Sequence, residues 1–446
     1  MHHAHHRLPA ALIALLALAL ASLTGAGHGQ VAHQPAATLL RPTAEARQAS
    51  PVIVIDTFQH DTSFYKQSTS GTAEPDLHEV LLGTRSLRVS TGGDAQQVNL
   101  RAPDLEPLDL SDVFLRLRLK VEGLEHLRHL YLYLSNDGFE THDVYPLLTY
   151  SPAPAERVLD DSEWGTLTLN LGSPLAPPVV DLTRVTDVQL SLVDDGAAPV
   201  NAWFAGLDAL ARPGRGVVTV MCYDARSGVY ELALPQAQRH GIRASVAVIR
   251  DLVGEESFMT LDQLQLIERF AEWEVVAHHV TALEHGFDRL SEPALRAELE
   301  GVKAWMLSHG FRRGADVIAY PHGLIDQPAI DVVRGYFAAG RTIVRGSGLE
   351  TLPPADPYRV RARSVESTDS VHALTAAIDR AAREKGWLVL VFHQFTNSPP
   401  EYAPQYSGLD FAQVMAHLAA ADVDVLTFTE AVLGRGLQRV RLEPDA

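Results

Sequence analysis

Short runs of alternating apolar and polar residues dominate the chain between positions 51 and 212. The clearest run covers residues 115–121 and reads Leu-Arg-Leu-Arg-Leu-Lys-Val. A period of two places successive side chains on opposite faces of a β-strand. Gly, Pro, Asn and Asp separate the runs, and helical patterns are rare here. The pattern predicts a β-sandwich over residues 51–212. Its predicted strands are VIVIDTF, RSLRVST, VFLRLRLKV, LYLYLSND, GTLTLNL, VTDVQLSLVDDG and NAWFAGLDAL.

The pattern changes after the segment ARPGRG at residues 211–216, which marks a domain boundary. Strand-like runs now alternate with helical ones. Thr260 and Gln263 have the spacing of a capping box, which predicts a helix as far as about Trp273. Ser291 and Pro293 open a second helix, whose apolar face is formed by Leu295, Leu299, Val302 and Met306. Residues 213–437 therefore have the size and alternation of a (β/α) barrel.

The N-terminal segment is typical of an export signal. One Arg and four His precede an apolar run over residues 9–21, and small residues follow it. We predict a signal peptide over residues 1–29 and an Ala-, Pro-, Gln- and Thr-rich linker over residues 30–50. The run is short for a membrane-spanning helix. An uncleaved anchor is the alternative, and both place the rest of the chain in the cell envelope, the periplasm or the extracellular space.

The composition and net charge of the chain limit the classes of function and partner that it can have. The 446 residues are 46% hydrophobic, so the chain can bury two substantial cores. The formal net charge of −18 argues against a nucleic-acid partner and permits a neutral polysaccharide. Cys222 is the sole cysteine, so no intrachain disulfide can form, and we expect it to be a buried strand residue. Oligomeric state does not follow from the sequence.

Polar residues gather where predicted strands of the second region end. The residues are Tyr223 and Asp224; His278, His279, Glu284 and His285; Tyr320, Pro321, His322 and Gly323; and His393. Enzymes built from βα units keep their chemistry at these strand ends. One carboxylate and two imidazoles can hold a divalent metal with a position open to water. A further His can protonate a leaving amine.

Each cluster has an ordinary structural explanation as well. A lone His at a strand end is more often a hydrogen-bonded residue than a ligand, and Pro and Gly punctuate turns. On a regular strand, His278 and His279 point to opposite faces, so at most one of them faces the site.

Together, these segments resemble the polysaccharide deacetylase family (the NodB homology domain, carbohydrate esterase family four) over residues 215–436. RGVVTVMCYDARSG resembles its first motif and EVVAHHVTALEHG its metal-binding His motif. IAYPHG resembles its Pro-Gly motif, and WLVLVFHQF its last motif. The resemblance implies a distorted (β/α) barrel and an Asp-His-His metal site, usually zinc, with cobalt or nickel as alternatives. It also implies removal of acetyl groups from N- or O-acetylated sugars.

The first and second motifs depart from the family pattern. The family reads aromatic-Asp-Asp-Gly, with a base and then a metal ligand. An ungapped match puts Tyr223 at the base and Asp224 at the ligand, whereas a one-residue gap makes Asp224 the base. One carboxylate is missing either way. His278 and His285 are seven positions apart instead of the usual four, so Glu284 can substitute as ligand or base.

The remaining site residues follow from the resemblance by position. Asp224, His278 and His285 are the implied metal ligands, with His279 as an alternative. His393 is the implied acid. The implied substrate-binding residues are Tyr320, Pro321, His322 and Gly323. The family often has an Arg two residues before the motif's Pro, and this chain has Ala319 there.

The β region more loosely resembles jelly-roll carbohydrate-binding modules of the galactose-binding-like class, through GTRSLRV, EWGTLTLNL and VNAWFAGLDAL. Tyr131, Tyr133, Trp164 and Trp203 are the aromatics available for a sugar platform. Trp164 and Trp203 lie within strand patterns, so we expect both in the core.

Three functions follow as hypotheses. The first is an exported, metal-dependent hydrolase that removes acetyl groups from a polysaccharide or cell-wall glycan. The second is a glycan-binding protein that keeps the barrel and has lost turnover, because a first-motif carboxylate is missing. The third is a related metal-dependent amidase or esterase with a non-sugar substrate.

Overall fold

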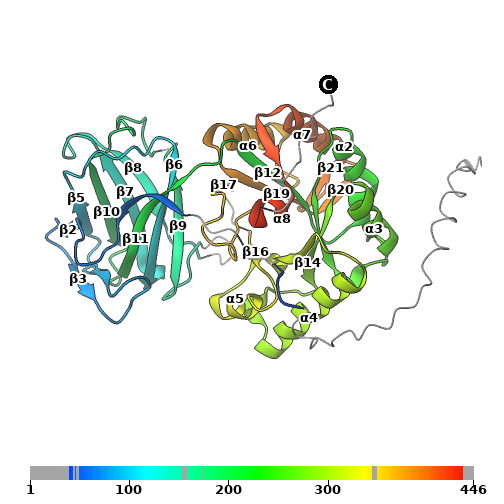
Figure 1. Cartoon of the computed structure of the whole chain (residues 1–446), viewed down its shortest axis with the longest axis horizontal. Coiled ribbons are helices and arrows are strands. Elements are labelled where there is room, and N and C mark those ends of the chain that lie inside the picture. Colours follow the sequence, from blue (N-terminus) through cyan, green and yellow to red (C-terminus); the bar gives the residue numbers. More distant parts are fainter. Residues whose placement is uncertain are drawn as a thin grey trace, which may run out of the picture. The chain divides into compact units, whose positions relative to one another are not determined.

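The computed structural model describes residues 40–43, 46, 50–152, 158–172, 174–343 and 349–434 (Figure 1). The predicted signal peptide and most of the predicted linker lie outside these residues, as do the last positions of the predicted barrel. Among the described residues, no helix combines the length and apolar character needed to cross a bilayer.

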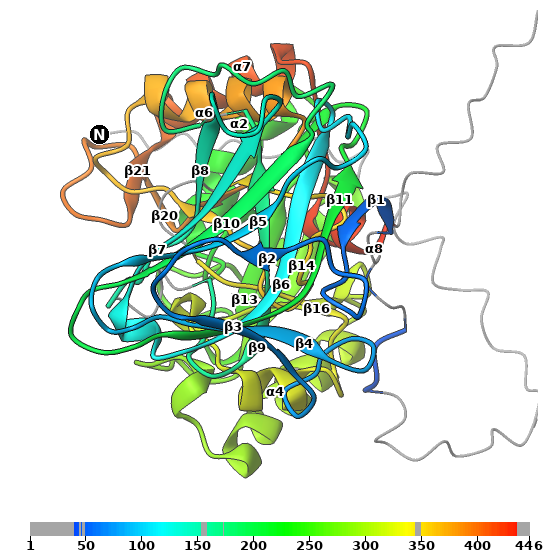
Figure 2. The same ribbon diagram turned by 90° about the vertical axis from the view of Figure 1, so that its left-hand side faces the viewer.

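The first half of the chain forms two antiparallel sheets, whose strands are seen from one side in Figure 2. One sheet has the order β3-β4-β11-β6-β9 with β1 paired to β11, and the other has the order β2-β5-β10-β7-β8. The strands are β1 Pro51–Asp56, β2 Tyr65–Lys66, β3 Thr72–Asp76, β4 Ser86–Ser90, β5 Gln97–Ala102, β6 Val113–Glu122, β7 Leu127–Ser135, β8 Asp143–Leu148, β9 Trp164–Asn170, β10 Asp187–Asp194 and β11 Asn201–Ala211.

The predicted alternation holds along β6. Leu115, Leu117 and Leu119 are buried in a core that both sheets share. Arg116 lies on the opposite face, where its guanidinium Nε is 2.8 Å from the Asp208 carboxylate of β11. The period of two therefore predicted both the strand and its buried face. The sequence analysis missed β2, β3, β5 and β8. Of these, β2 and β3 are short or polar, whereas β5 does alternate and buries Val98, Leu100 and Ala102.

Of the two tryptophans expected in the core, only Trp203 is buried. Trp203 is 5% exposed but lies outside the shared apolar core. Its ring Nε1 donates to Asp76 Oδ2 at 2.8 Å, and the hydrogen bond lowers the pKa of Asp76 to about 2. Arg88 and Lys120 cover the ring at 5.3 Å each. Trp164 is half-buried. An indole needs a partner for its N–H, and here a solvent-side carboxylate supplies it.

The second half is built on one nine-stranded sheet with the order β16-β15-β14-β13-β12-β19-β17, to which β18 and β22 add. All ladders are parallel except the one between β17 and β19. Among the described residues, no ladder joins β16 to β17, so the barrel is incomplete. Its strands are β12 Gly216–Cys222, β13 Ser245–Ile249, β14 Glu274–His279, β15 Gly314–Ala319, β16 Ala339–Arg341, β17 Leu349–Glu350, β18 Arg363–Ser364, β19 Trp387–Phe392 and β22 Val423–Val425.

The predicted helices of this half are confirmed. The helix α3 (Leu261–Phe270) begins at a complete capping box between Thr260 and Gln263. The helix α4 (Glu292–Ser308) buries the predicted apolar face, although the Ser291 side chain makes no capping bond. Cys222 is fully buried, as expected. The remaining α-helices and strands are α2 Leu234–Gln238, α5 Gln327–Val333, α6 Val371–Glu384, α7 Gly408–Ala420, α8 Phe428–Leu433 and a short pair of strands, β20 Gln394–Thr396 and β21 Gln405–Ser407.

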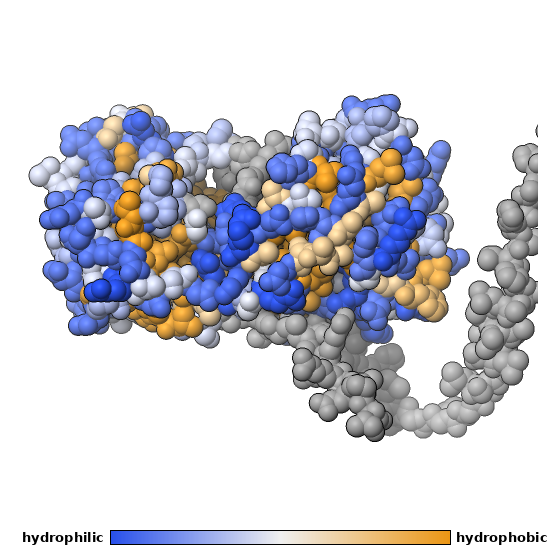
Figure 3. Space-filling model, turned by 90° about the horizontal axis from the view of Figure 1, so that it is seen from above, coloured by the Kyte–Doolittle hydropathy of each residue, from blue (hydrophilic) through white to orange (hydrophobic). Residues whose placement is uncertain are grey.

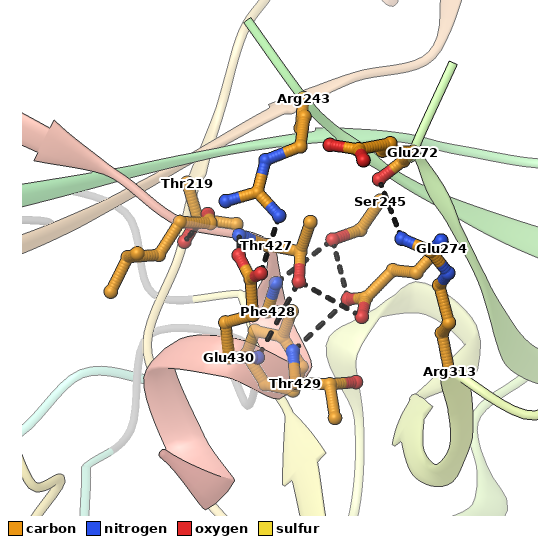
Figure 4. Close-up of polar contacts among 11 residues, drawn as sticks. Thr219, Arg243, Ser245, Glu272, Glu274, Arg313, Thr427, Phe428, Thr429 and Glu430 are labelled. Carbon is orange, nitrogen blue, oxygen red and sulfur yellow. Dashed lines mark hydrogen bonds and ion pairs between the residues drawn. The ribbon is translucent and has the colours of Figure 1, made fainter. Parts of the chain in front are cut away.

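The final helix α8 is fixed at the end of the sheet where the parallel strands begin (Figure 4). β12 pairs with β22 along its first residues and with β13 along its last two. Glu274, the first residue of β14, is buried among donors from β13 and α8. It accepts from Ser245 Oγ at 2.7 Å, Thr427 Oγ1 at 3.0 Å and the Thr429 amide at 3.0 Å. This cluster joins the end of the chain to the central strands.

The surface seen from above is mainly hydrophilic, with separate apolar patches among the charged side chains (Figure 3). Exposed large apolar residues include Leu77, Leu175, Phe270 and Leu409. Scattered apolar residues of this kind are normal for a folded protein surface.

Candidate functional site

The C-terminal ends of β12, β14, β15 and β19 lie together, because these strands are parallel neighbours in one sheet. They bring Tyr223, Asp224, His278, His279 and His393 into one cluster. The sequence analysis named all five of these residues.

Tyr223 lies at the centre of the cluster and is 3% exposed. Its ring centroid is 4.7 Å from that of His278 and 5.0 Å from that of His393. The Arg341 guanidinium carbon lies 4.4 Å from the same ring centroid. The Tyr223 hydroxyl donates to the Tyr320 carbonyl at 3.3 Å. The phenol is therefore held in a fixed position between two imidazoles and a cation.

Asp224 stands at a sharp break in the backbone. Asp224 and Ala225 both have positive φ values, 59° and 49°, so the chain leaves β12 through two left-handed residues. Asp224 Oδ1 is 3.7 Å from His278 Nε2, and Oδ2 is 4.0 Å from Arg226 Nε. Burial raises the pKa of Asp224, whereas the charges of Arg226 and His322 oppose that rise. The turn thus directs this carboxylate toward the imidazoles.

His278 and His279 both face the cluster, which corrects the expectation that only one of them can. Their ring centroids are 4.0 Å apart. The ladder between β13 and β14 shifts register here, because Val248 pairs with Ala277 and Ile249 pairs with His279. His278 is the extra residue of a bulge, and a bulge breaks strict alternation.

The imidazoles of the cluster are held neutral by burial. Desolvation lowers the pKa of His278 well below 6.5, and it lowers the pKa of both His279 and His393 to about 4. His278 Nδ1 lies 2.8 Å from the Ala319 carbonyl, so Nδ1 carries the proton and Nε2 presents a lone pair toward Asp224. His279 Nδ1 makes a similar bond to the Thr281 carbonyl.

The loop after β14 places Glu284 and His285 differently from the strand residues. Glu284 is exposed, and His285 Nδ1 lies 2.9 Å from the Gly286 carbonyl. No contact of either side chain with Asp224 or His278 is found among the described residues. His322, in a left-handed conformation (φ 55°), reaches the same loop through the Leu283 carbonyl at 3.0 Å. Its neighbours Pro321 and Gly323 are buried.

The donor set around Asp224 is incomplete for a divalent metal in the described part of the chain. Asp224 and His278 provide two suitable donors, a carboxylate and a neutral imidazole nitrogen that face each other. Within the described ranges, however, no group of three His, Cys, Asp or Glu side chains is arranged to hold an ion. A protein zinc site normally has at least three such ligands. The described residues therefore do not fit a complete metal site.

Arg341 was missed by the sequence analysis and completes the cluster. It ends β16, lies in register with Ala319 of β15 and is fully buried. Nη1 donates to the Thr342 carbonyl at 3.0 Å, but Nε and Nη2 have no partner in the described part of the chain, and neither has His393 Nδ1. Burial lowers the pKa of Arg341 to about 9. A buried Arg normally faces a carboxylate, and here Tyr223 occupies the adjacent space.

A signal for Arg341 existed in the sequence. The resemblance implies an Arg at position 319, where this chain has Ala, and the next strand of a parallel sheet lies beside that position. An Arg within the apolar run 337–344 was therefore a candidate to replace it. Strand register, which cannot be read from a single sequence, decides between the candidates.

No protein-family model matches the chain, and no curated protein matches it. Solved structures with similar folds include the Xyl-CE4 domain of a multidomain xylanase from the hindgut metagenome of Trinervitermes trinervoides (15% identity, 49% of this chain and 90% of that chain, TM-score 0.35). They also include a family 4 acetyl xylan esterase from Clostridium thermocellum in complex with a cobalt ion (15% identity, 48% and 89%, TM-score 0.35). A third is a carbohydrate-binding module of the β-sandwich superfamily (14% identity, 35% and 61%, TM-score 0.27).

Proposed function

We propose that this chain is an exported hydrolase that removes acetyl groups from an N- or O-acetylated polysaccharide. The observation that carries the proposal is that His278, His393 and the buried cation of Arg341 all contact Tyr223 at the C-terminal strand ends, with Asp224 beside His278. Such a group combines proton-transfer residues with positive charge in a largely dehydrated place. Hydrolysis of an amide or ester needs both.

His393 is the residue best placed to move protons. Its neutral imidazole can accept a proton from water as the water oxygen bonds to the acetyl carbon. The resulting imidazolium then gives that proton to the leaving nitrogen or oxygen as the bond between that atom and the acetyl carbon breaks. The products are acetic acid, which ionises to acetate in solution, and the free sugar amine or hydroxyl. Negative charge on the acetyl oxygen raises the proton affinity of a nearby imidazole, which offsets the low resting pKa of about 4.

The cations and Asp224 have supporting roles in this reaction. Arg226 and Arg341 are the positive charges that act on His393, and the same charges favour an oxyanion formed beside it. Asp224 lies between Arg226 and His278 and can orient the attacking water. Zinc, cobalt or nickel dependence remains a prediction from the resemblance, with Asp224 and His278 as the first ligands to test.

A glycan-binding protein without turnover is the second candidate. Tyr223 stands where the resemblance implies a catalytic carboxylate, and a phenol with an ordinary pKa near 10 is a poor base at neutral pH. The described residues also lack a group of three metal ligands. Both observations favour a barrel that keeps its architecture and has lost its chemistry.

Acetate release by the purified protein separates these candidates. The substrates are acetylated chito-oligosaccharides, peptidoglycan and acetylated xylan, each with chelator, zinc or cobalt. We expect release, and we expect Asp224→Ala and His393→Ala each to lower it by about a hundredfold. Asp262→Asn, on the first turn of α3, is the surface control.

The outcomes of this assay distinguish the hydrolase of acetylated glycans, the binding protein and the amidase or esterase. Release that survives both substitutions contradicts the proposed site. Release from none of the glycans favours the binding protein, and release only from simple non-sugar esters or amides favours an amidase or esterase. Metal content, measured on the wild type and on Asp224→Ala, tests the metal prediction separately.

A further inference from the structure

Two arginines of the described chain are buried, and they differ in their partners. Arg116 of the sandwich is 7% exposed, and Arg341 of the barrel is 0% exposed. Arg116 Nε and Nη2 donate to the two carboxylate oxygens of Asp208 at 2.8 and 2.9 Å. This side-on pairing matches two parallel N–H bonds of a guanidinium to the two oxygens of one carboxylate. The sandwich thus shows how this protein buries a guanidinium with an acidic partner.

The same two nitrogens of Arg341 lack such a partner. Nε and Nη2 are buried and make no hydrogen bond within the described part of the chain. Nη1, at the other side of the guanidinium, donates to the Thr342 carbonyl at 3.0 Å. Burial lowers the pKa of Arg341 to about 9, and no carboxylate among the described residues opposes that effect. At neutral pH the side chain is therefore still a cation, and its carboxylate-binding edge is unpaired.

A second buried donor near Arg341 is also unpaired. His393 Nδ1 has no partner among the residues that the structure describes. The His393 ring centroid lies 5.0 Å from that of Tyr223, and the Arg341 guanidinium carbon lies 4.4 Å from the same centroid. A buried polar group without a partner costs free energy, and native proteins keep few of them. Two such groups around one phenol point to a ligand that both can contact.

The charge and geometry of these groups select the class of ligand. A monovalent anion neutralises the one unpaired cation, whereas a divalent anion leaves an excess charge in a buried place. Two oxygens match Nε and Nη2, as Asp208 shows at Arg116. A spherical halide meets both N–H bonds with a single atom and lacks this match. Since Arg341 is fully buried in a closely packed interior, the ion must also be small.

We propose that the edge of Arg341 formed by Nε and Nη2 binds a small carboxylate ion, such as formate or acetate, beside Tyr223 and His393. The site is distinct from the pair of Asp224 and His278, and its occupation does not rest on hydrolysis by the barrel. Where the proposed function also holds, the bound ion supplies negative charge near Tyr223, the position at which the resemblance implies a catalytic carboxylate.

Thermal unfolding of the full chain in different sodium salts tests the proposal. The salts are formate, acetate, chloride and pivalate at equal pH and ionic strength. Pivalate carries the same charged group on a bulky tert-butyl substituent, which a fully buried site excludes. At about a hundred times its dissociation constant, we expect formate or acetate to raise the melting temperature of the wild type by about 5 °C. The dependence on concentration should saturate, and pivalate should have little effect.

Four variants locate the effect. Arg341→Met removes the binding edge and should abolish the rise. Arg116→Met is the matched control, because the edge that it removes is already bonded to Asp208, so the rise should remain. Arg341→Lys keeps the charge without the two parallel N–H bonds and should weaken binding of the ion by about tenfold. Tyr223→Asp supplies a carboxylate from the chain itself, so the response should be lost although Arg341 is present.

The outcomes that would refute the site are distinct from those that test hydrolysis. Equal rises in formate and pivalate, or an undiminished rise in Arg341→Met, would overturn the proposal. A rise in chloride as large as that in formate would overturn the assignment to a carboxylate. If Arg341→Met does not fold, full responses in both Arg341→Lys and Tyr223→Asp would refute the site instead. None of these measurements uses acetate release, so this proposal and the proposed function can fail separately.

Discussion

The buried charged side chains at the two ends of the barrel sheet differ in how completely they are hydrogen-bonded. Where the parallel strands begin, Glu274 receives donors on both carboxylate oxygens, from β13 and from α8 (Figure 4). Where the same strands end, Arg341 and His393 have buried nitrogen atoms with no partner in the described chain. Around Glu274 the carboxylate is fully bonded and one hydroxyl oxygen, Thr429 Oγ1, lacks a partner in the described chain, whereas at the other end a buried cation itself has bonding capacity left open.

This contrast separates stability from function within one sheet. Buried polar groups that are fully hydrogen-bonded fix a structure, whereas an unsatisfied buried group costs free energy and persists where it has another role. In βα folds the beginning of the strands serves stability and their carboxyl ends serve chemistry. The unpaired Arg341 is therefore evidence for a working or a once-working site.

The largest change in the free energy of unfolding is expected at Glu274, where the parallel strands begin. Glu274→Ala leaves Ser245, Thr427 and Thr429 with buried, unpaired donors, so we expect a loss of about 4 kcal/mol in the free energy of unfolding. Urea denaturation measures it. Glu272→Ala, an exposed neighbour, is the control and should change little. A loss in Glu274→Ala no larger than that of the control would contradict the structural role of this cluster.

The next effect concerns the missing carboxylate. Tyr223→Asp places an acid next to His393 and Arg341 and restores the pattern that the resemblance implies. If a base limits turnover, we expect acetate release to rise by about a hundredfold over wild type. Tyr223→Asn introduces a side chain of the same size as Asp without its charge. This variant should release acetate at or below the wild-type rate. Equal rates in the two variants would show that the carboxylate is not what the site lacks.

A smaller effect is expected from the unpaired cation itself. Arg341→Met removes a buried charge that has no counter-ion and keeps most of its volume. We expect the free energy of unfolding to rise by about 1 kcal/mol while acetate release falls.

Arg116→Met is the matched comparison in the sandwich, because Arg116 is buried and makes two bonds to Asp208. There we expect a loss of about 2 kcal/mol, less than for a fully broken pair since Arg118 still faces Asp208. Destabilisation of both variants by equal amounts would mean that Arg341 has a stabilising partner after all.

Much of this architecture was predictable from local patterns. The period of two along residues 115–121 gave β6 and its buried face, and the capping box at Thr260 gave α3. The strand-end placement of Tyr223, Asp224, His278 and His393 also followed, because parallel strands bring their ends together.

What escaped prediction depends on contacts between strands. The bulge at His278 turns two adjacent imidazoles to one side, and only the pairing with β13 shows it. Arg341 enters the site through its register with Ala319. Trp203 is buried outside the apolar cluster of the sandwich, where Asp76, distant in sequence, accepts its N–H. Each of these features is a long-range pairing that local periodicity does not encode.

The smallest effect is a pH dependence at Glu274. Burial raises the pKa of Glu274 above its ordinary value of 4.5. As the pH rises above 4.5, the unfolded chain loses this proton before the folded chain does, so folding becomes less favourable until the pH exceeds the folded pKa. Glu274→Gln does not titrate. Its free energy of unfolding should therefore fall less than that of wild type as the pH rises above 4.5.

Urea denaturation across that range, with Glu272→Gln as the exposed control, measures the difference in slope. The control should follow the wild type. Parallel slopes for wild type and Glu274→Gln would mean that the three donors hold Glu274 ionised throughout. Glu274 would then be a buried charge, as Arg341 is. The two residues would differ only in their hydrogen-bond partners, which Glu274 has and Arg341 largely lacks.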